Sequence, residues 1–374
     1  MIPKSKKEKI TGHLSGEDIR GILNKKAGFD IAFSLKDENP SEVKSWIPTG
    51  SRWLDSIICK GKPAGIPVGK IVEIAGLEAS GKSYLAALIA ANAQKMGMSV
   101  VWFDSESAVD PEFIEKLGIN LDSGTFTYVQ AQSVEFVFET IETLLSQQNV
   151  LYILDSFANT PCKADMEDPN FDPSSSMARK ARIASLAMQK LTLPIANANS
   201  TFLVLNQLRT NLNTSDPSSM KIDPWMTPGG KALIYAYSLR IWLTGRKAKD
   251  SYLNNDKGYR IGSELKAKLK KSRFGTEGRE AGFKIVWGED PIGIRDEESW
   301  QEALELTGAI QTAGAWKSIT AKDGTIMKFQ GTSWMEKMKD PMFRETVLNV
   351  MDVEVIQKFN DKTGNADAHY SIDS

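Results

Sequence analysis

Cysteine and histidine are scarce in this chain, which has two of each among its 374 residues. Cys59 and Cys162 give neither metal-ligand spacing nor a disulfide framework, so we expect no zinc site. No apolar run is long enough to cross a bilayer, and the basic N-terminus lacks the apolar segment of a signal peptide. These absences predict a cytoplasmic protein with no membrane partner.

The chain also lacks a net charge of consequence. Its 46 lysines and arginines are balanced by 47 aspartates and glutamates, which leaves a formal net charge of -1. The overall charge therefore predicts no nucleic-acid partner, and any such binding must come from local basic patches. The 41% hydrophobic content supports a sizeable core. The length suits one large domain with appendages, or two domains.

The clearest motif is glycine-rich. Residues 76–83 read G-L-E-A-S-G-K-S and fit the pattern G-x-x-x-x-G-K-[ST]. The residues before them predict a buried strand, and those after them predict a helix. Backbone N–H groups at such a turn hold a polyphosphate, helped by the helix dipole. We expect Lys82 to reach the β- and γ-phosphates and Ser83 to ligate Mg²⁺. The alternative is a strand-to-helix turn with no ligand.

Apolar strand-like runs alternate with helical stretches through the middle of the chain. The predicted strands are 71–75, 100–103, 150–154, 202–205, 239–243 and 283–287, and the predicted helices are 83–96, 110–117, 134–147 and 176–193. This alternation predicts a mostly parallel sheet with helices on both faces. Ligands of such sheets gather outside the carboxyl ends of the strands.

Acidic residues stand at two of these strand ends. Glu106 follows the run at 100–103, where a carboxylate can orient and activate water, although such a residue alone is more often a cap or a solvated loop. Asp155 follows the run at 150–154 in the form of a Walker B motif. Its carboxylate is expected to support magnesium through Ser83 and water.

Two polar segments and one basic run have no obvious structural purpose. Residues 163–177 are expected to form a mobile loop, and residues 210–228 a long Pro- and Ser-rich loop with Trp225 exposed. Long loops in compact domains are usually functional, so we expect a second ligand coupled to the nucleotide. The basic run at 266–273 fits either a solvated edge strand or a phosphate contact.

The two ends of the chain differ from the middle. Residues 1–45 form a basic arm with a short amphipathic helix, on which Ile19, Ile22 and Leu23 share a face. The arm either packs on its own core or is donated to a neighbouring subunit. Residues 291–374 are expected to form a small α+β domain with a disordered tail.

In combination and order, these motifs resemble those of the RecA recombinases, including the phage UvsX-like branch. The resemblance is carried by the following stretches: P-T-G-S at 48–51, V-G-K-I-V-E-I at 68–74, the glycine-rich motif, D-S-E-S-A-V-D-P at 104–111, L-D-S at 154–156, N-Q-L-R at 206–209, G-G-K-A-L at 229–233 and K-S-R at 271–273. It implies a RecA-type P-loop ATPase core at 46–290, with DNA-binding loops near 163–177 and 209–228.

The resemblance also implies an activity. The expected protein uses ATP and Mg²⁺, forms a helical filament on single-stranded DNA, and exchanges strands with homologous double-stranded DNA. Single-strand-binding and loader proteins are further expected partners, in the cytoplasm of a bacterium or of a phage-infected host. Two alternatives stay open: a hexameric RecA-fold motor resembling replicative helicases, and a non-catalytic paralogue or mediator.

Individual roles follow from the matched motifs. Glu106 matches the catalytic carboxylate, Gln207 the sensor of the γ-phosphate, and Lys271 and Arg273 two cations that reach a neighbouring subunit's phosphates. The resemblance and the motif together place nucleotide contacts at Gly76, Leu77, Glu78, Ala79, Ser80, Gly81, Lys82, Ser83, Tyr84, Asp110, Phe113 and Asp155. It places DNA contacts at Met177, Arg182, Ser185, Arg209, Gly229 and Gly230.

The chain departs from the family's pattern at several places. Arg273 stands where bacterial members usually have lysine, which keeps the charge but changes the geometry. The second loop is long and carries Trp225 in a Pro-rich setting. The arm has no clear match, and the end of the chain carries no strong acidic tail. These differences favour a phage protein over a bacterial one.

Overall fold

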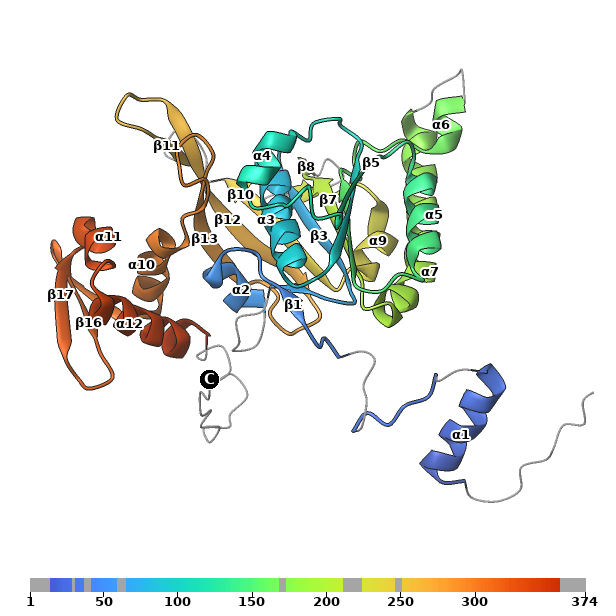
Figure 1. Ribbon diagram of the computed structural model, residues 1–374, viewed down its shortest axis with the longest axis horizontal. Coiled ribbons are helices and arrows are strands. Elements are labelled where there is room, and N and C mark those ends of the chain that lie inside the picture. Colours follow the sequence, from blue (N-terminus) through green and yellow to red (C-terminus); the bar gives the residue numbers. More distant parts are fainter. Residues whose placement is uncertain are drawn as a thin grey trace, which may run out of the picture. The chain divides into compact units, whose positions relative to one another are not determined.

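A computed structural model describes residues 14–28, 31–36, 42–58, 65–167, 173–210, 224–245 and 251–356 of the chain (Figure 1). The chain divides into two units, Met1–Glu42 and Val43–Ser374, and each is described by itself. Among the helices described, none is long and apolar enough to span a membrane.

A ten-stranded sheet forms the centre of the larger unit, in the order β14-β13-β12-β10-β3-β7-β6-β4-β5 with β11 paired to β12. Neighbouring strands from β10 to β5 are parallel, whereas β11 to β14 pair antiparallel. In chain order the strands are β3 (Ile71–Gly76), β4 (Ser99–Asp104), β5 (Phe126–Gln130), β6 (Val150–Asp155), β7 (Thr201–Gln207), β10 (Leu239–Gly245), β11 (Tyr252–Asn254), β12 (Arg260–Ser272), β13 (Glu280–Val286) and β14 (Gly293–Ile294). Two short strands, β1 (Trp46–Ile47) and β2 (Ile66–Pro67), pair beside it.

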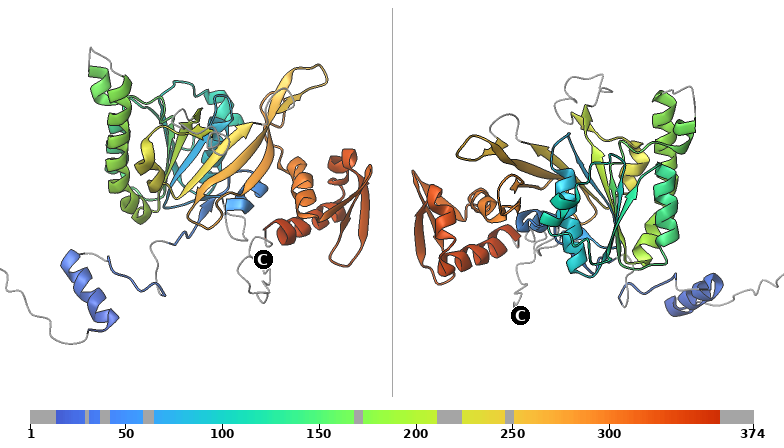
Figure 2. Two further views of the ribbon diagram at one scale, coloured as in Figure 1. Left: turned by 180° about the vertical axis from the view of Figure 1, so that it is seen from behind. Right: turned by 45° about the horizontal axis from the view of Figure 1, so that its top comes forward.

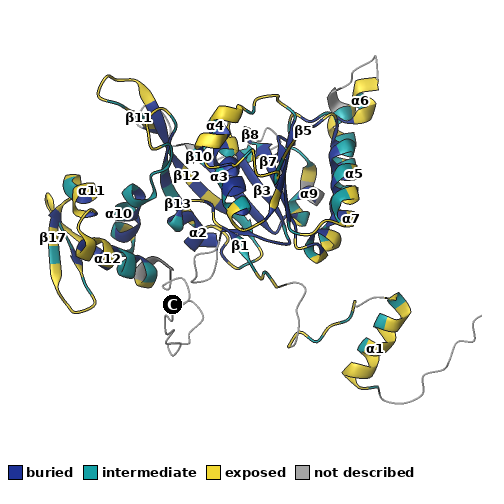
Figure 3. Ribbon diagram, viewed as in Figure 1, coloured by how far each residue is buried: buried dark blue, intermediate teal, exposed yellow. Residues whose placement is uncertain are grey.

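Helices cover both faces of this sheet (Figure 2). One face packs against α2 (Arg52–Ile58), α3 (Lys82–Lys95) and α4 (Pro111–Lys116), and the other against α5 (Val134–Leu144), α7 (Pro173–Asn197) and α9 (Gly230–Ala236). Strands β3 and β6 are buried along their whole length, as apolar strands between two helical layers are (Figure 3). A ligand therefore approaches this part of the sheet at the carboxyl ends of its strands.

The C-terminal part is a small α+β structure that continues from β14. Its elements are α10 (Asp296–Thr307), β15 (Ile310–Ala313), β16 (Trp316–Thr320), β17 (Ile326–Gln330), a 3₁₀ turn (Gly331–Ser333), α11 (Trp334–Lys337), α12 (Pro341–Val350) and a π-helical turn (Met351–Ile356). The rings of Phe329, Trp334 and Phe343 pack with centroids 5.2 to 5.6 Å apart. Lys284 of β13 pairs with Glu298 of α10 at 3.0 Å, which ties this part to the sheet.

The smaller unit contains one helix, α1 (Gly16–Ala27), within its described residues. Ser15 and Asp18 form a capping box, in which each side chain accepts the other residue's backbone N–H. The expected amphipathic helix is therefore present. Its apolar residues Ile19, Ile22 and Leu23 are 40 to 45% exposed, and α1 has no buried residue.

The mostly parallel, helix-covered sheet predicted from the sequence is confirmed, with three differences. The sequence did not predict β5, whose short run alternates between polar and apolar residues. The basic run is not at an edge, because β12 lies between β10 and β13. The segment expected to be a loop at 163–177 is helical at both described ends, as α6 (Lys163–Glu167) and the start of α7.

Candidate active site

The glycine-rich turn joins β3 to α3 in a shape that suits a phosphate. Ala79 and Gly81 have left-handed backbones, with φ of 54° and 78°, which makes successive N–H groups converge. A Cβ on Gly81 would come within 2.8 Å of the Ile285 side chain, so only glycine fits there. The buried hydroxyl of Ser80, in the same turn, has no hydrogen-bond partner among the described residues. The turn therefore offers donors that a polyphosphate would satisfy.

A cavity of about 330 Å³ lies against this turn. Its walls are formed by Glu78, Ala79, Ser80, Gly81, Lys82, Ser83, Tyr84, Glu106, Asp155, Gln207, Arg260, Ile285 and Trp287. The four chemically distinctive residues predicted from the sequence, Lys82, Glu106, Asp155 and Gln207, thus meet in one space. They come from the carboxyl ends of four strands, β3, β4, β6 and β7, that are neighbours in the sheet.

Lys82 and Asp155 both have pKa values shifted by burial. The Lys82 ammonium donates to the carbonyl oxygens of Leu77 at 2.8 Å and Gly76 at 3.3 Å, and burial lowers its pKa. Burial raises the pKa of Asp155 to about 6, although a hydrogen bond from the Ser83 side chain works in the opposite direction. Ser83 and Asp155 thus line the same cavity close to each other, as the predicted magnesium site requires.

Glu106 is held by two residues that follow β6 and by Asp104 at the end of β4. One of its carboxylate oxygens accepts from Ser156 Oγ at 2.9 Å and from Asn159 Nδ2 at 2.5 Å. The backbone N–H of Glu106 donates to the Asp104 carboxylate at 2.8 Å. This Asp104 carboxylate also accepts the N–H of Ala108 and the hydroxyl of Tyr128. Asp104 thus organises the loop that carries Glu106. The sequence interpretation did not assign it a role, although it directly follows the apolar run.

The far wall of the cavity contains residues that the sequence interpretation did not identify as a site. Arg260, Ile285 and Trp287 line it from β12 and the end of β13. The Arg260 guanidinium carbon is 3.8 Å from the centroid of the Tyr252 ring and 5.2 Å from that of Trp287. The sequence signal that could have identified this wall is Trp287, an aromatic residue directly after the strand β13. This wall can stack against a flat base.

Two predicted base contacts, Asp110 and Phe113, do not line the cavity. Asp110 caps α4, where it accepts the N–H of Glu112 at 3.0 Å. Phe113 packs edge-on against Tyr84, with ring centroids 5.6 Å apart. Tyr84 in turn donates its hydroxyl to the Val286 carbonyl at 2.5 Å, and burial raises its pKa to about 12.

The two cations predicted to act on a neighbour are also absent from the cavity walls. Lys271, near the end of β12, donates to the carbonyl oxygens of Ile234 at 2.8 Å and Tyr235 at 3.0 Å. Arg273 donates to the Tyr235 carbonyl at 2.8 Å. Burial and the charges of Arg273 and Arg240 lower the pKa of Lys271 to about 8. In this protomer, therefore, both cations sit on the last turn of α9.

The predicted DNA contacts lie on the helices and strands that flank the two polar segments. Met177, Arg182 and Ser185 are on α7, and Met177 and Arg182 are exposed. Arg209 lies on β8 (Arg209–Thr210), which pairs with β9 (Trp225–Met226) and closes the second segment at its base.

Gly229 and Gly230 stand where the second segment enters α9. Gly229 has φ of 110°, and a Cβ there would lie 2.3 Å from Leu233 Cδ2. Gly230 faces the Ala181 side chain of α7, so the helices after the two segments touch. The expectation that Trp225 is exposed is wrong, because its ring is half-buried against a core cluster that contains Leu208 and Trp242. Residues 168–172 and 211–223, with Met220, lie outside the described residues.

The fold and this turn define a P-loop protein: a glycine-rich G-x-x-x-x-G-K-[ST] turn after the central strand of a mostly parallel sheet, with acidic residues at the neighbouring strand ends. A family model described as "RecA N-terminal domain" matches residues 18–293. The RecA protein of Ruminococcus albus is 33% identical over 300 residues, which cover 79% of this chain and 70% of that protein. The RecA protein of Haemophilus ducreyi is 31% identical over 316 residues, with 84% and 79% covered. The chain belongs to the RecA family.

Proposed function

We propose that this chain is an ATP-dependent recombinase, which forms a helical filament on single-stranded DNA and exchanges strands with a homologous duplex. One observation carries the proposal: Lys82, Glu106, Asp155 and Gln207 line one cavity, and the predicted second DNA segment starts two residues after Gln207. Hydrolysis and DNA binding can then influence each other over a short distance.

In this scheme the residues of the cavity named below have definite tasks. The P-loop amides and Lys82 would hold the phosphates of ATP. Ser83, with Asp155 acting through water, would hold Mg²⁺, which would supply neutralisation of the developing charge. Glu106 orients the attacking water, with its carboxylate fixed by Ser156 and Asn159. Gln207 contacts the γ-phosphate. Trp287 stacks on the base from the opposite wall.

We infer that the site is completed by the next protomer in the filament. Lys271 and Arg273 do not line their own protomer's cavity, and on leaving the α9 carbonyls they would reach a neighbour's phosphates in the manner of an arginine finger. The half-exposed apolar side chains of α1 support the proposal that the arm at 1–45 docks on a neighbouring protomer. The remainder divides into an ATPase core at 46–290 and a C-terminal domain from 291.

DNA is proposed to contact the two polar segments. Positive charge would come from two exposed arginines, Arg182 on α7 and Arg209 at the base of the second segment. Gly229 and Gly230, which lack side chains, would leave their backbone N–H groups accessible to phosphates. Such contacts bind phosphates without reading sequence. They explain how a chain with a net charge of -1 would hold DNA.

We also place the chain in the phage UvsX-like branch of the family. Arg273 in place of lysine and the long Pro-rich second segment support this, and so does the modest identity of 31 to 34% to bacterial RecA proteins. A phylogeny that contains both phage and bacterial chains tests the assignment.

The proposed activity is tested by ATP hydrolysis with and without single-stranded DNA, followed by strand exchange with a homologous and a heterologous duplex. We expect DNA to stimulate hydrolysis and only the homologous duplex to exchange. Electron microscopy with DNA and a slowly hydrolysed ATP analogue should show extended filaments. Closed rings would instead identify a hexameric motor, and the absence of DNA stimulation a non-catalytic mediator.

A further inference from the structure

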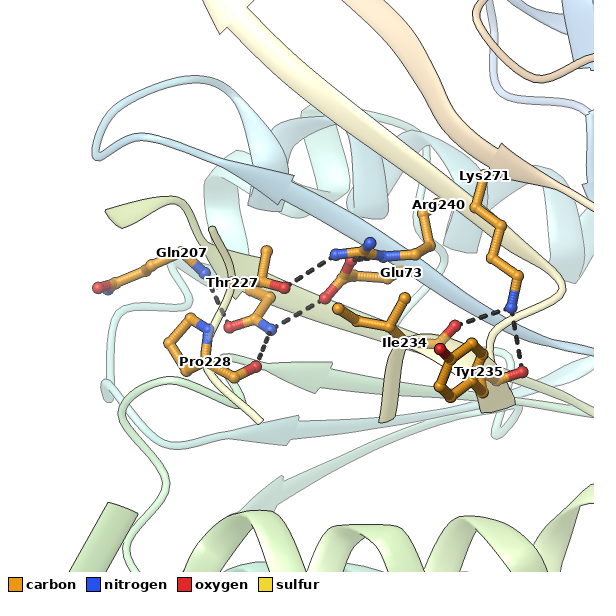
Figure 4. Close-up of polar contacts among 9 residues, drawn as sticks. Glu73, Gln207, Thr227, Pro228, Ile234, Tyr235, Arg240 and Lys271 are labelled. Carbon is orange, nitrogen blue, oxygen red and sulfur yellow. Dashed lines mark hydrogen bonds and ion pairs between the residues drawn. The ribbon is translucent and has the colours of Figure 1, made fainter. Parts of the chain in front are cut away.

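A buried polar cluster connects the strand that carries Gln207 to the end of the second segment (Figure 4). Glu73 of β3 and Arg240 of β10 form an ion pair at 2.6 Å, with side chains only 0% and 5% exposed. Neither charge faces the cavity described above. A buried ion pair is costly to desolvate and is not in itself evidence for stability, so its other partners are informative.

Those partners belong to the second segment and to β7. Arg240 donates a second hydrogen bond, at 2.8 Å, to the hydroxyl of Thr227, which follows β9 and is itself buried. The amide nitrogen of Asn206 donates to Glu73 at 3.0 Å and to the carbonyl of Pro228 at 3.1 Å. Both hydrogens of this amide are therefore used, and one of them is bonded to the segment itself.

The same asparagine is bonded to Gln207. Its side-chain oxygen accepts the backbone N–H of Gln207 at 3.0 Å. In Figure 4 the Gln207 side chain points away from the cluster while its backbone stays attached to it. A shift of the Gln207 backbone would thus change the position of Asn206, and through Asn206 and Arg240 it would reach Pro228 and Thr227.

We propose that Glu73, Arg240, Asn206 and Thr227 are positioning residues that couple the nucleotide cavity to the base of the second segment. Because the cluster is buried and its bonds are directional, it transmits a displacement instead of absorbing it. Thr227 belongs to the end of the second segment, and its hydroxyl is the group that bonds to Arg240. Without this hydroxyl the base of the segment keeps its glycines and its β8–β9 pairing, but loses its bond to the ion pair.

This inference rests on the proposed function, and its test measures coupling. The quantity is the ratio of two dissociation constants for a fluorescent single-stranded oligonucleotide, one measured with ADP and the other with a slowly hydrolysed ATP analogue. In Thr227→Val, which removes the hydroxyl at nearly constant shape, we expect this ratio to fall about tenfold. Thr227→Ser keeps the hydroxyl and should preserve the wild-type ratio.

A matched control separates coupling from stability. Thr276 is also a buried threonine, and its hydroxyl bonds to the Ile58 carbonyl at 2.9 Å and to the Ser272 hydroxyl at 2.6 Å, both outside the cluster. Thr276→Val should destabilise the fold about as much as Thr227→Val does, as measured by thermal unfolding. It should nevertheless preserve the wild-type ratio of dissociation constants.

Three outcomes would overturn the proposal. If Thr227→Val keeps the wild-type ratio of dissociation constants, the cluster does not couple the two sites, and the proposed function stands. The same conclusion follows if the ratio falls equally in Thr276→Val. A wild-type protein whose DNA affinity does not depend on the nucleotide would refute the proposed function, and the coupling with it.

Discussion

The ammonium group of Lys271 donates to the carbonyl oxygen of Ile234 at 2.8 Å, in the last turn of α9. The last carbonyls of a helix have no partner within the helix, and a cation there is favoured by the helix dipole. In the protomer, Lys271 therefore caps the helix that follows the second segment. Contact with a neighbour's phosphates would require it to leave this cap, so the proposed filament assembly would compete with the capping of α9.

The lowered pKa of Lys271 predicts how assembly depends on pH. The charged form is needed to bind a phosphate. In its capped position, where its pKa is about 8, the lysine loses its charge as the pH rises through that value, so fewer protomers can bind a neighbour's phosphates. We expect DNA-stimulated hydrolysis by the wild type to fall between about pH 7 and pH 9. Lys271→Arg stays charged over this range and should give a lower but flatter profile. The same decline in both proteins would show that another group titrates.

The proposed base-stacking role of Trp287 predicts a selective effect on ATP affinity. Removal of the ring in Trp287→Ala takes away a stacking surface worth roughly 0.5–1.5 kcal/mol, so KM for ATP should rise about two- to tenfold with little change in kcat. Trp287→Phe, which keeps an aromatic face, should lie close to wild type. An unchanged KM in the alanine variant would exclude this wall from base binding.

How much of this site could be predicted from sequence depended on the distance between its parts along the chain. Lys82 and Ser83 belong to a local motif whose spacing is fixed by the turn, and Glu106, Asp155 and Gln207 each follow an apolar strand. Arg260 and Trp287 reach the same cavity only because β12 and β13 fold back beside β10. No local sequence pattern predicts that strand pairing.

Other features depended on contacts that a single sequence does not show. Strand β5 was not predicted because its exposed edge position permits polar residues. In the run at 266–273 exposed and buried residues alternate, with Lys266 and Lys268 exposed, but the strands that pair with it on both sides could not be predicted from the sequence. The ion pair of Glu73 and Arg240 joins strands 167 residues apart, so it is visible only in the folded chain.

The carboxylate of Asp104 provides a test of how Glu106 is positioned. Asp104→Asn replaces one acceptor oxygen by an amide donor, so it cannot accept both the Glu106 N–H and the Ala108 N–H. We expect kcat for ATP hydrolysis to fall about 10- to 100-fold, as displaced general bases do, with ATP affinity nearly unchanged. Tyr128→Phe removes one bond to the same carboxylate and should have a much smaller effect. A kcat close to wild type in Asp104→Asn would contradict this role.

The central claim, that each ATP site is completed by the next protomer, is tested most directly by mixing two inactive variants. Lys82→Ala lacks a working P-loop but keeps Lys271, whereas Lys271→Ala has the reverse defect. In an equal mixture assembled on single-stranded DNA, about a quarter of the sites should combine an intact P-loop with an intact neighbouring lysine, so hydrolysis should return to about a quarter of the wild-type rate. No recovery in filaments that contain both variants would mean that Lys271 acts on its own protomer.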